Sequence, residues 1–284
     1  MVLANEKVGV VGAGLMGAEI ALVFSLAGRH VTLIDQKQEH LQSALQRLRS
    51  VLEKGVARGF YRLDQVEPAF DRIQRDTRLE QLAACQYVTE AVFEDLSVKT
   101  SVWSQLDSIC PADCIFATNT STIPISTLAS TVKASRRPFF IGTHYFSPVS
   151  RMKLVEVIPG FETSPDCVDF TIETCRALGK TPVRVKDVPG FAVNRVLHAF
   201  IIEAVRLVDE GVASPEDIDL ACRLGLGHPM GPFELMDAVT SSLCVQAQEI
   251  MYEAYGERFR PPTLLKQRVA AGFCGGKGRA GWRR

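Results

Sequence analysis

The sequence predicts an α/β fold: a Rossmann-type, doubly wound and mostly parallel sheet, followed by an all-α C-terminal domain. Three observations lead to this prediction. Short apolar runs typical of buried strands alternate with helical segments up to residue 187. A glycine-rich turn joins the first strand to the first helix. From Phe191 onward the sequence contains no convincing strand.

The elements of the first part follow one another in a regular order. Residues 7–14 form a β-branched run ended by glycine, which is typical of a buried parallel strand. A helix is expected over 16–28 and a second strand over 30–35, so the three form a βαβ unit. A polar helix follows over 38–59. The alternation continues with strands at 72–78, 86–92, 114–121, 138–146, 153–160 and 182–187, and with helices at 79–85, 96–110, 125–132 and 164–179.

The last part is expected to be helical throughout. Ser214 and Pro215 begin one helix, over 214–227, as N-cap and first helical residue. A long helix is expected over 231–256. The pattern changes near Val188–Pro189, so we expect one domain over 1–188 and a second over 189–284. An apolar stripe begins the second domain with Phe191, Val196, Leu197, Phe200, Ile201 and Val205.

The composition argues against several classes of partner and site. Lys plus Arg equals Asp plus Glu, at 32 residues each, so no nucleic acid or anionic membrane is expected as a partner. The eight cysteines include no C-x-x-C pair and no His/Cys cluster with zinc spacing, so no metal is expected. Scattered cysteines in apolar stretches indicate reduced thiols in a cytoplasmic protein. The apolar run at 8–11 ends at Gly12 and reads as a strand rather than a signal peptide, and no stretch is long enough to span a bilayer.

The turn after the first strand matches a dinucleotide-binding fingerprint. Gly12 permits the tight turn, Gly14 lets a pyrophosphate approach the backbone, and Gly17 lets the helix pack close to the strand. Asp35 ends the second strand, where its carboxylate can accept hydrogen bonds from both ribose hydroxyls and repel a 2′-phosphate. The fingerprint therefore predicts NAD rather than NADP, although Lys37 lies close to Asp35. The alternative is a doubly wound fold whose glycine-rich turn binds no nucleotide.

Ligands in open α/β sheets bind beyond the carboxyl ends of the strands, so polar residues there are candidates for chemistry. These residues are Glu94, Lys99, Ser121, His144 and Glu156. Glu156 lies inside an apolar run, and a buried carboxylate is costly unless it is paired. His144 is the obvious partner, and a His–carboxylate pair beside a nicotinamide could take the proton that an alcohol releases as its hydride leaves.

Each candidate also has a purely structural interpretation. Ser121 could cap the helix that begins near Ile123, Lys99 could lie on a solvated face, and His144 could be a structural histidine. The other histidines suit a strand start, a solvated helix face, the interior of a helix and a loop, and these are His30, His40, His198 and His228.

Six segments, in this order and spacing, carry a more specific signal than the glycine motif. They are "VGVVGAGLMG", "TEAVFEDLSVK", "ATNTSTIPIS", "GTHYFSPVSRMKLVEVIPG", "VPGFAVNRVL" and "GHPMGPFELMD". Over essentially its full length the chain resembles the L-3-hydroxyacyl-CoA dehydrogenases. The resemblance implies an NAD-binding domain over 1–188, and a helical substrate and dimerisation domain over 189–284. It also implies a homodimer that reversibly oxidises an acyl-CoA at its 3-hydroxyl, a step used in fatty acid β-oxidation, in butanol or polyester synthesis and in aromatic degradation.

The resemblance also assigns roles to residues. His144 matches the catalytic base and Glu156 its orienting carboxylate, while Ser121 and Asn194 match residues that contact the substrate, Ser121 also lying near the nicotinamide. Beside the fingerprint glycines, the residues that match cofactor contacts are Leu15, Met16, Asp35, Glu94, Lys99 and Lys277. Lys54 and Arg58 are candidates for binding the CoA phosphates because of their position in the helix after the second strand, and a solvated face is the alternative for both.

The chain departs from the family pattern in two places. Ser147 stands where many single-function members have asparagine. The multifunctional β-oxidation subunits resemble this chain in having serine there. The ending "GFCGGKGRAGWRR" matches the usual C-terminal motif only loosely. Two other functions compete with the family reaction. One is oxidation of a free hydroxy acid, for which related enzymes use a lysine at the domain junction, where this chain has Asn194. The other is a non-catalytic NAD-binding protein with a structural or redox-sensing role.

Overall fold

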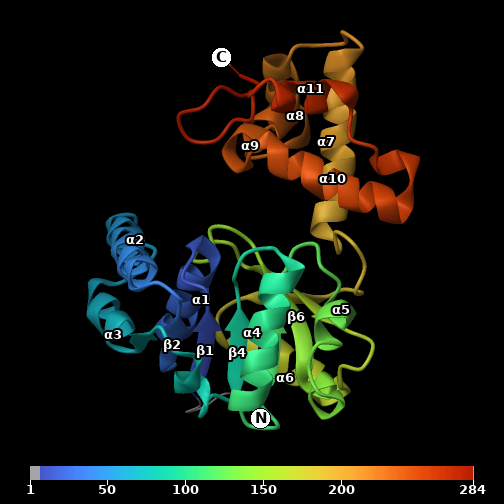
Figure 1. Ribbon diagram of the computed structural model, residues 1–284. Coiled ribbons are helices and arrows are strands. Elements are labelled where there is room, and N and C mark those ends of the chain that lie inside the picture. The colour runs from blue at the N-terminus through green and yellow to red at the C-terminus, as the bar shows by residue number, and fades with distance from the viewer. Residues whose placement is uncertain (1–6, 284) are drawn as a thin grey trace. The chain divides into compact units, whose positions relative to one another are not determined.

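The computed structural model describes residues 7–283 and divides into two compact units, one ending at Asp187 and the other beginning at Val188. Residues 1–6 and 284, the outer ends of the two predicted domains, lie outside the described part. The ribbon of Figure 1 shows an α/β unit and a helical unit.

The first unit is built on an eight-stranded sheet with the order β3-β2-β1-β4-β5-β6-β7-β8. All neighbouring strands are parallel except β6 and β7, which are antiparallel. The mostly parallel doubly wound sheet predicted from the alternating apolar runs is therefore confirmed. The strands are β1 (Val8–Val11), β2 (Val31–Ile34), β3 (Ile73–Asp76), β4 (Tyr87–Glu90), β5 (Ile115–Thr118), β6 (Phe140–Tyr145), β7 (Leu154–Pro159) and β8 (Thr181–Arg184).

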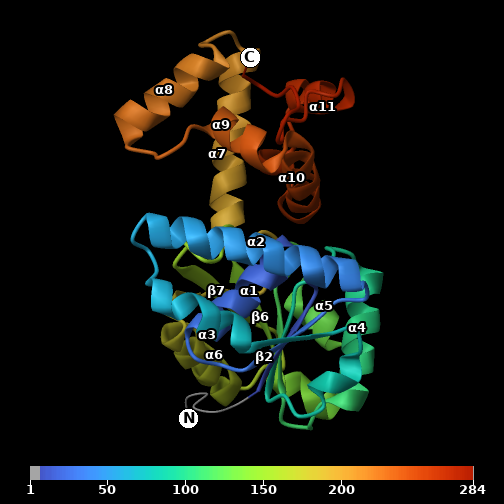
Figure 2. The same cartoon turned by 90° about the vertical axis from the view of Figure 1, so that its left-hand side faces the viewer.

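Helices cover both faces of this sheet, as Figure 2 shows. One face carries α1 (Leu15–Leu26), α2 (Gln38–Ala57), α3 (Val66–Asp71) and α6 (Pro165–Ala177). The other carries α4 (Leu96–Ile109) and α5 (Ile125–Ala129). Burial explains why α1 and β1 are apolar on all sides: α1 is buried from Gly17 to Ser25 and β1 is buried along its whole length.

The second unit is helical throughout its described part. Its helices are α7 (Val193–Asp209), α8 (Pro215–Leu226), α9 (Pro232–Val239), α10 (Ser241–Tyr255) and α11 (Thr263–Ala270). Ser214 caps α8 as predicted, because its side chain accepts a hydrogen bond from the Asp217 N–H. The core of this unit includes Phe233, Met236 and Trp282.

The single long helix expected over 231–256 is wrong, because the chain breaks into α9 and α10 at Thr240. Thr240 has φ 90°, outside the helical region, and the Ser241 N–H donates to Cys274 O. The C-terminal segment packs at this break: the Asp237 carboxylate accepts the N–H groups of Trp282 and Arg283. Tertiary contacts thus overrode a continuous helical pattern.

Smaller elements also differ from the prediction. The helix expected over 79–85 is a short 3₁₀ turn, Leu79–Leu82, and the short helices α3 and α11 were not predicted. No helix in the part of the chain that is described is long and apolar enough to cross a bilayer. All eight cysteines are free, and seven of them are buried.

Candidate active site

The glycine turn between β1 and α1 has the geometry that a dinucleotide requires. Gly12 has φ +100°, and a Cβ there would lie 2.6 Å from Ala91 O. A Cβ on Gly17 would lie 1.9 Å from Gly12 O, so only glycine permits this packing of helix on strand. A Cβ on Gly14 would meet nothing within 4 Å, which leaves the open approach that a pyrophosphate needs. No side chain caps the first turn of α1, so its N–H groups can serve an anion.

The Asp35 carboxylate lies beside this turn and is held in place by it. Oδ2 accepts the Ala13 N–H at 2.8 Å, and Oδ1 accepts the Lys37 N–H at 3.1 Å. Nδ1 of His40 lies 2.8 Å from Oδ1, and Arg47 Nη2 donates to Ala13 O at 2.9 Å. His40 and Arg47 thus belong to the surroundings of the turn, although the sequence pattern did not point to either of them.

His144, Glu156 and Ser121 form one hydrogen-bonded chain. Nδ1 of His144 lies 2.8 Å from Glu156 Oε2, and Nε2 lies 3.0 Å from Ser121 Oγ. His144 is 5% exposed and Glu156 1% exposed, so the contact between them is shielded from solvent. An ionised carboxylate can only accept a hydrogen bond, so the imidazole proton lies on Nδ1, and the Nε2 lone pair faces Ser121.

The sheet itself aligns this pair. His144 on β6 and Glu156 on β7 are direct partners in the antiparallel register. Directly opposed residues of antiparallel strands project from the same face of a sheet. Glu156 lies within β7, inside the buried apolar run where the sequence placed it, and the reversal of β7 brings it to His144.

A second hydrogen-bonded network, centred on the partly exposed Glu94, holds the loop that carries Ser121. Oε1 of Glu94 accepts hydrogen bonds from the hydroxyls of Thr120 and Thr122, at 2.6 and 2.9 Å, and from the N–H groups of Ser121 and Thr122, both at 2.8 Å. Ser121 does not cap the following helix, whose first N–H groups donate to Asp187 instead. The orientation of Ser121 thus depends on Glu94.

Lys99 lies behind Glu94 and is fully buried. Its ammonium lies 2.6 Å from Glu90 Oε1 and 3.4 Å from Glu94 Oε2, so the solvated face considered for it does not apply. Burial by itself would raise the pKa of Glu94, but the Lys99 charge and the hydrogen bonds from the 120–122 loop outweigh burial. The pKa of Glu94 therefore lies below its usual value, and the carboxylate is ionised at neutral pH.

Two predicted site residues lie in the helical unit. Asn194 is the second residue of α7, and Lys277 is an exposed residue of the C-terminal segment. That segment is integrated into its unit: Trp282 is 4% exposed and its indole donates to Ser241 Oγ at 3.0 Å. A Cβ on Gly281 would lie 2.0 Å from the Asp237 carboxylate, so this glycine allows the segment to wrap around Asp237.

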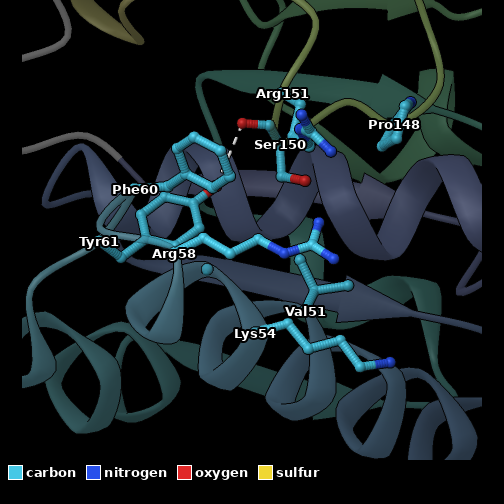
Figure 3. Close-up of a pocket in the computed structure, with 9 residues that line it drawn as sticks. Val51, Lys54, Arg58, Phe60, Tyr61, Pro148, Ser150 and Arg151 are labelled. Atoms are coloured by element: carbon cyan, nitrogen blue, oxygen red, sulfur yellow. Dashed lines mark hydrogen bonds between the residues drawn. The ribbon is translucent and has the colours of Figure 1, made fainter.

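Lys54 and Arg58, chosen from sequence position alone, line a cavity of about 150 Å³ in the first unit. Figure 3 shows the side chain of Arg58 extending from α2 beneath Ser150 and Arg151, which belong to the loop after β6. Phe60 and Tyr61 form another wall. The lining residues that follow Arg58 were not among the sequence candidates, although "GFY" and "SRMK" place aromatic and basic residues together. Within the described residues, no group of three or more His, Cys, Asp or Glu could hold a metal ion.

Comparisons with known proteins agree along the whole chain. The family profile described as 3-hydroxyacyl-CoA dehydrogenase, NAD binding domain, matches residues 7–188, and that of the C-terminal domain matches 190–284. The chain is 41% identical to a probable 3-hydroxybutyryl-CoA dehydrogenase of Deinococcus radiodurans, over 97% of this chain and 99% of that protein. It is 39% identical to the human mitochondrial hydroxyacyl-coenzyme A dehydrogenase, over 96% of this chain and 88% of that protein.

Solved structures give the same result. FadB2 of M. tuberculosis superposes with a TM-score of 0.94 at 36% identity, covering 99% of each chain. The (S)-3-hydroxybutyryl-CoA dehydrogenase PaaH1 of Ralstonia eutropha superposes with a TM-score of 0.92 at 35% identity, covering 98% of each chain.

The fold and the glycine turn define an NAD-dependent dehydrogenase, and NAD is its cofactor. More particularly, the chain belongs to the 3-hydroxyacyl-CoA dehydrogenase family, as the sequence motifs predicted.

Proposed function

We propose that the protein catalyses the reversible NAD-dependent oxidation of L-3-hydroxyacyl-CoA to 3-ketoacyl-CoA, with His144 as general base. The observation that carries this proposal is the chain from Glu156 through His144 to Ser121, at 2.8 and 3.0 Å, in the same unit as an NAD-type glycine turn. Alcohol oxidation needs a hydride acceptor and a base for the hydroxyl proton, and this chain supplies the base.

The proton of the substrate 3-hydroxyl is transferred to Nε2 of His144. Because the Glu156 carboxylate accepts a hydrogen bond from Nδ1–H, Nε2 carries the lone pair that takes the proton, and the ionised carboxylate stabilises the imidazole when it becomes charged. Ser121 Oγ lies 3.0 Å from Nε2, so a substrate 3-oxygen within reach of Nε2 also lies within hydrogen-bonding reach of the Ser121 hydroxyl. In the reverse direction His144 returns the proton to the ketone oxygen.

The cofactor site is assigned to the first unit, with one residue from the second. When bound, NAD accepts the hydride at its nicotinamide ring. The turn formed by Gly12, Gly14, Leu15, Met16 and Gly17 receives the pyrophosphate, and Asp35 receives the ribose hydroxyls. Glu94 and Lys99 shape the nicotinamide side of the site, since Glu94 holds the loop of Ser121. Lys277 is the contact that we assign to the C-terminal segment.

The substrate is assigned contacts from both units. Asn194 contacts the substrate near the reacting carbon, and the helical unit, residues 189–284, provides the dimer interface of a homodimer. Lys54 and Arg58 bind the CoA phosphates, supported by their place on a cavity without acidic lining residues. We place the enzyme in the cytoplasm and its reaction in fatty acid β-oxidation.

The proposal is tested by following the oxidation of NADH in the presence of acetoacetyl-CoA. The assay is then repeated with NADPH in place of NADH. We expect turnover with NADH and little with NADPH, because Asp35 would repel the 2′-phosphate. The His144→Ala variant should lose roughly 10²–10⁴-fold in kcat, the usual contribution of a general base.

Circular dichroism and NADH binding serve as controls for the folding of that variant. Near-normal kcat in a folded His144→Ala variant would refute the assignment of the base. Absence of turnover with every acyl-CoA, together with tight NAD binding, would favour a non-catalytic role, and turnover of a free hydroxy acid would refute the substrate class.

A further inference from the structure

We propose that Arg151, together with Phe60, binds the 3′-phosphorylated adenosine of CoA and thereby selects CoA thioesters over thioesters of shorter pantetheine carriers. This inference rests on the proposed function, because it assumes that the substrate is an acyl thioester. It concerns a residue outside the predicted phosphate-binding helix: Arg151 lies on the loop between β6 and β7 and faces the cavity from the side opposite to Arg58 (Figure 3).

The charge around the cavity calls for an anionic ligand. Lys54, Arg58 and Arg151 all line it, and none of the lining residues is acidic. Within the described residues, the side chains of these three cations form no hydrogen bond or ion pair. Clustered like charges without counterions repel one another and raise the local concentration of anions. CoA offers a diphosphate and a 3′-phosphate, and Arg151 adds to α2 the cation that a second phosphate position needs.

The neighbouring aromatic ring suits a nucleobase. Phe60 is 55% exposed, and the Arg151 guanidinium lies 5.1 Å from the centroid of its ring. An exposed ring beside a planar cation is a surface on which bases stack, while the guanidinium can still bind phosphate with its N–H groups. Adenosine 3′-phosphate combines both features in one ligand, and free pantetheine has neither.

The loop that carries Arg151 is fixed before any ligand binds. The Ser150 N–H donates to the buried Glu19 carboxylate at 2.8 Å, and the Tyr61 hydroxyl donates to Ser150 O at 3.1 Å. The Lys180 ammonium donates to the carbonyls of Val149 and Met152. Ligand binding therefore spends little free energy on ordering this loop, which favours selectivity.

The space beyond Arg151 can accommodate a base. A second cavity of about 400 Å³ shares Phe60, Tyr61, Ser150 and Arg151 with the first. Lys153 also lines it, and again no lining residue is acidic. Arg151 thus stands between two adjoining hollows, one against α2 for the diphosphate and one for the adenosine.

The test compares two thioesters that differ only in this end of the molecule, acetoacetyl-CoA and acetoacetyl-pantetheine. In the Arg151→Ala variant we expect KM for acetoacetyl-CoA to rise roughly 10–100-fold with kcat unchanged, the effect of one charge-assisted hydrogen bond. KM for acetoacetyl-pantetheine should stay the same. Arg151→Lys should restore part of the affinity, since it keeps the charge and loses the planar fork. Arg75→Ala, which removes an exposed arginine of β3, is the matched control and should change neither KM.

Binding of adenosine 3′,5′-bisphosphate, measured by calorimetry, separates this inference from the proposed function. Weaker binding to Arg151→Ala than to the unmodified protein supports the inference, even if neither thioester is turned over. An unchanged KM for acetoacetyl-CoA, an equal rise for both thioesters, or unchanged bisphosphate binding would overturn it, even if the dehydrogenase activity is confirmed.

Discussion

Replacement of Glu156 by glutamine probes the reasoning about the active site most directly. The change preserves the size of the side chain and leaves an oxygen that can accept a hydrogen bond from His144 Nδ1–H, but it removes the negative charge. Glu156 is 1% exposed and lies 2.8 Å from Nδ1, so solvent cannot compensate for the loss of that charge. Glu156 lies on β7, whereas the glycine turn joins β1 to α1 on the other side of β4, β5 and β6, so NAD binding should be unchanged.

The size of the effect follows from this geometry. A hydrogen bond to a charged group contributes roughly 1.5–3 kcal/mol, against about 1 kcal/mol for a neutral one. A full charge pair at about 4 Å and an effective dielectric constant of about 20 gives about 4 kcal/mol as an upper limit. The hydrogen bond therefore loses about 0.5–2 kcal/mol, and since about 1.4 kcal/mol corresponds to a factor of ten, kcat should fall about 2- to 30-fold and at most about 1000-fold.

The assay measures kcat with acetoacetyl-CoA, NADH affinity by fluorescence, and thermal unfolding. Glu162→Gln, which neutralises an exposed acid paired with Arg137 shortly after β7, is the matched control and should behave like the unmodified protein. A folded Glu156→Gln variant with unchanged kcat would refute the role of the Glu156 charge. Loss of NADH affinity at unchanged kcat would instead assign Glu156 a structural role.

Two further changes test other parts of the structure. Glu94→Gln should lower kcat about tenfold and the free energy of unfolding by about 1–2 kcal/mol, because the hydrogen bonds that hold the Ser121 loop lose their charged acceptor. Steady-state kinetics and thermal melting measure these two effects, and an unchanged kcat would contradict the prediction. Burial lowers the pKa of His198 to about 4 from an ordinary value of about 6.5, so between these pH values the unfolded chain binds more protons. The free energy of unfolding therefore decreases as the pH is lowered from about 6.5 to about 4. The loss should reach about 3 kcal/mol at pH 4, and His198→Leu should remove it in urea titrations at several pH values; an unchanged pH dependence in that variant would refute the assignment to His198.

The sequence was sufficient for the parallel sheet because its central strands β1, β4, β5 and β6 are buried along their whole length. Such strands appear as unbroken apolar runs, and the glycines between them have specific backbone roles. The same reasoning identified Glu156, since a carboxylate inside an apolar run must find a partner. The hydrogen bond to His144 has the geometry that this argument requires.

What the sequence did not reveal depends on contacts between distant segments. The break at Thr240 depends on Cys274 and on the wrapping of Asp237 by Gly281 and Trp282. No local pattern in 231–256 encodes a partner that lies so much later in the chain. Likewise the cavity between α2 and the Arg151 loop joins residues nearly a hundred positions apart, so that only the folded backbone brings their charges together.

The direct pairing of His144 with Glu156 across β6 and β7 makes the proton relay a property of the sheet. Slipping either strand by one residue would turn both side chains to opposite faces, so no partly shifted register retains a weakened relay. Catalytic activity should therefore be lost in the same cooperative transition as the backbone hydrogen bonds between β6 and β7. On heating, we expect the enzyme to remain fully aligned until β6 and β7 separate, and inactivation to follow the unfolding of these strands rather than to precede it.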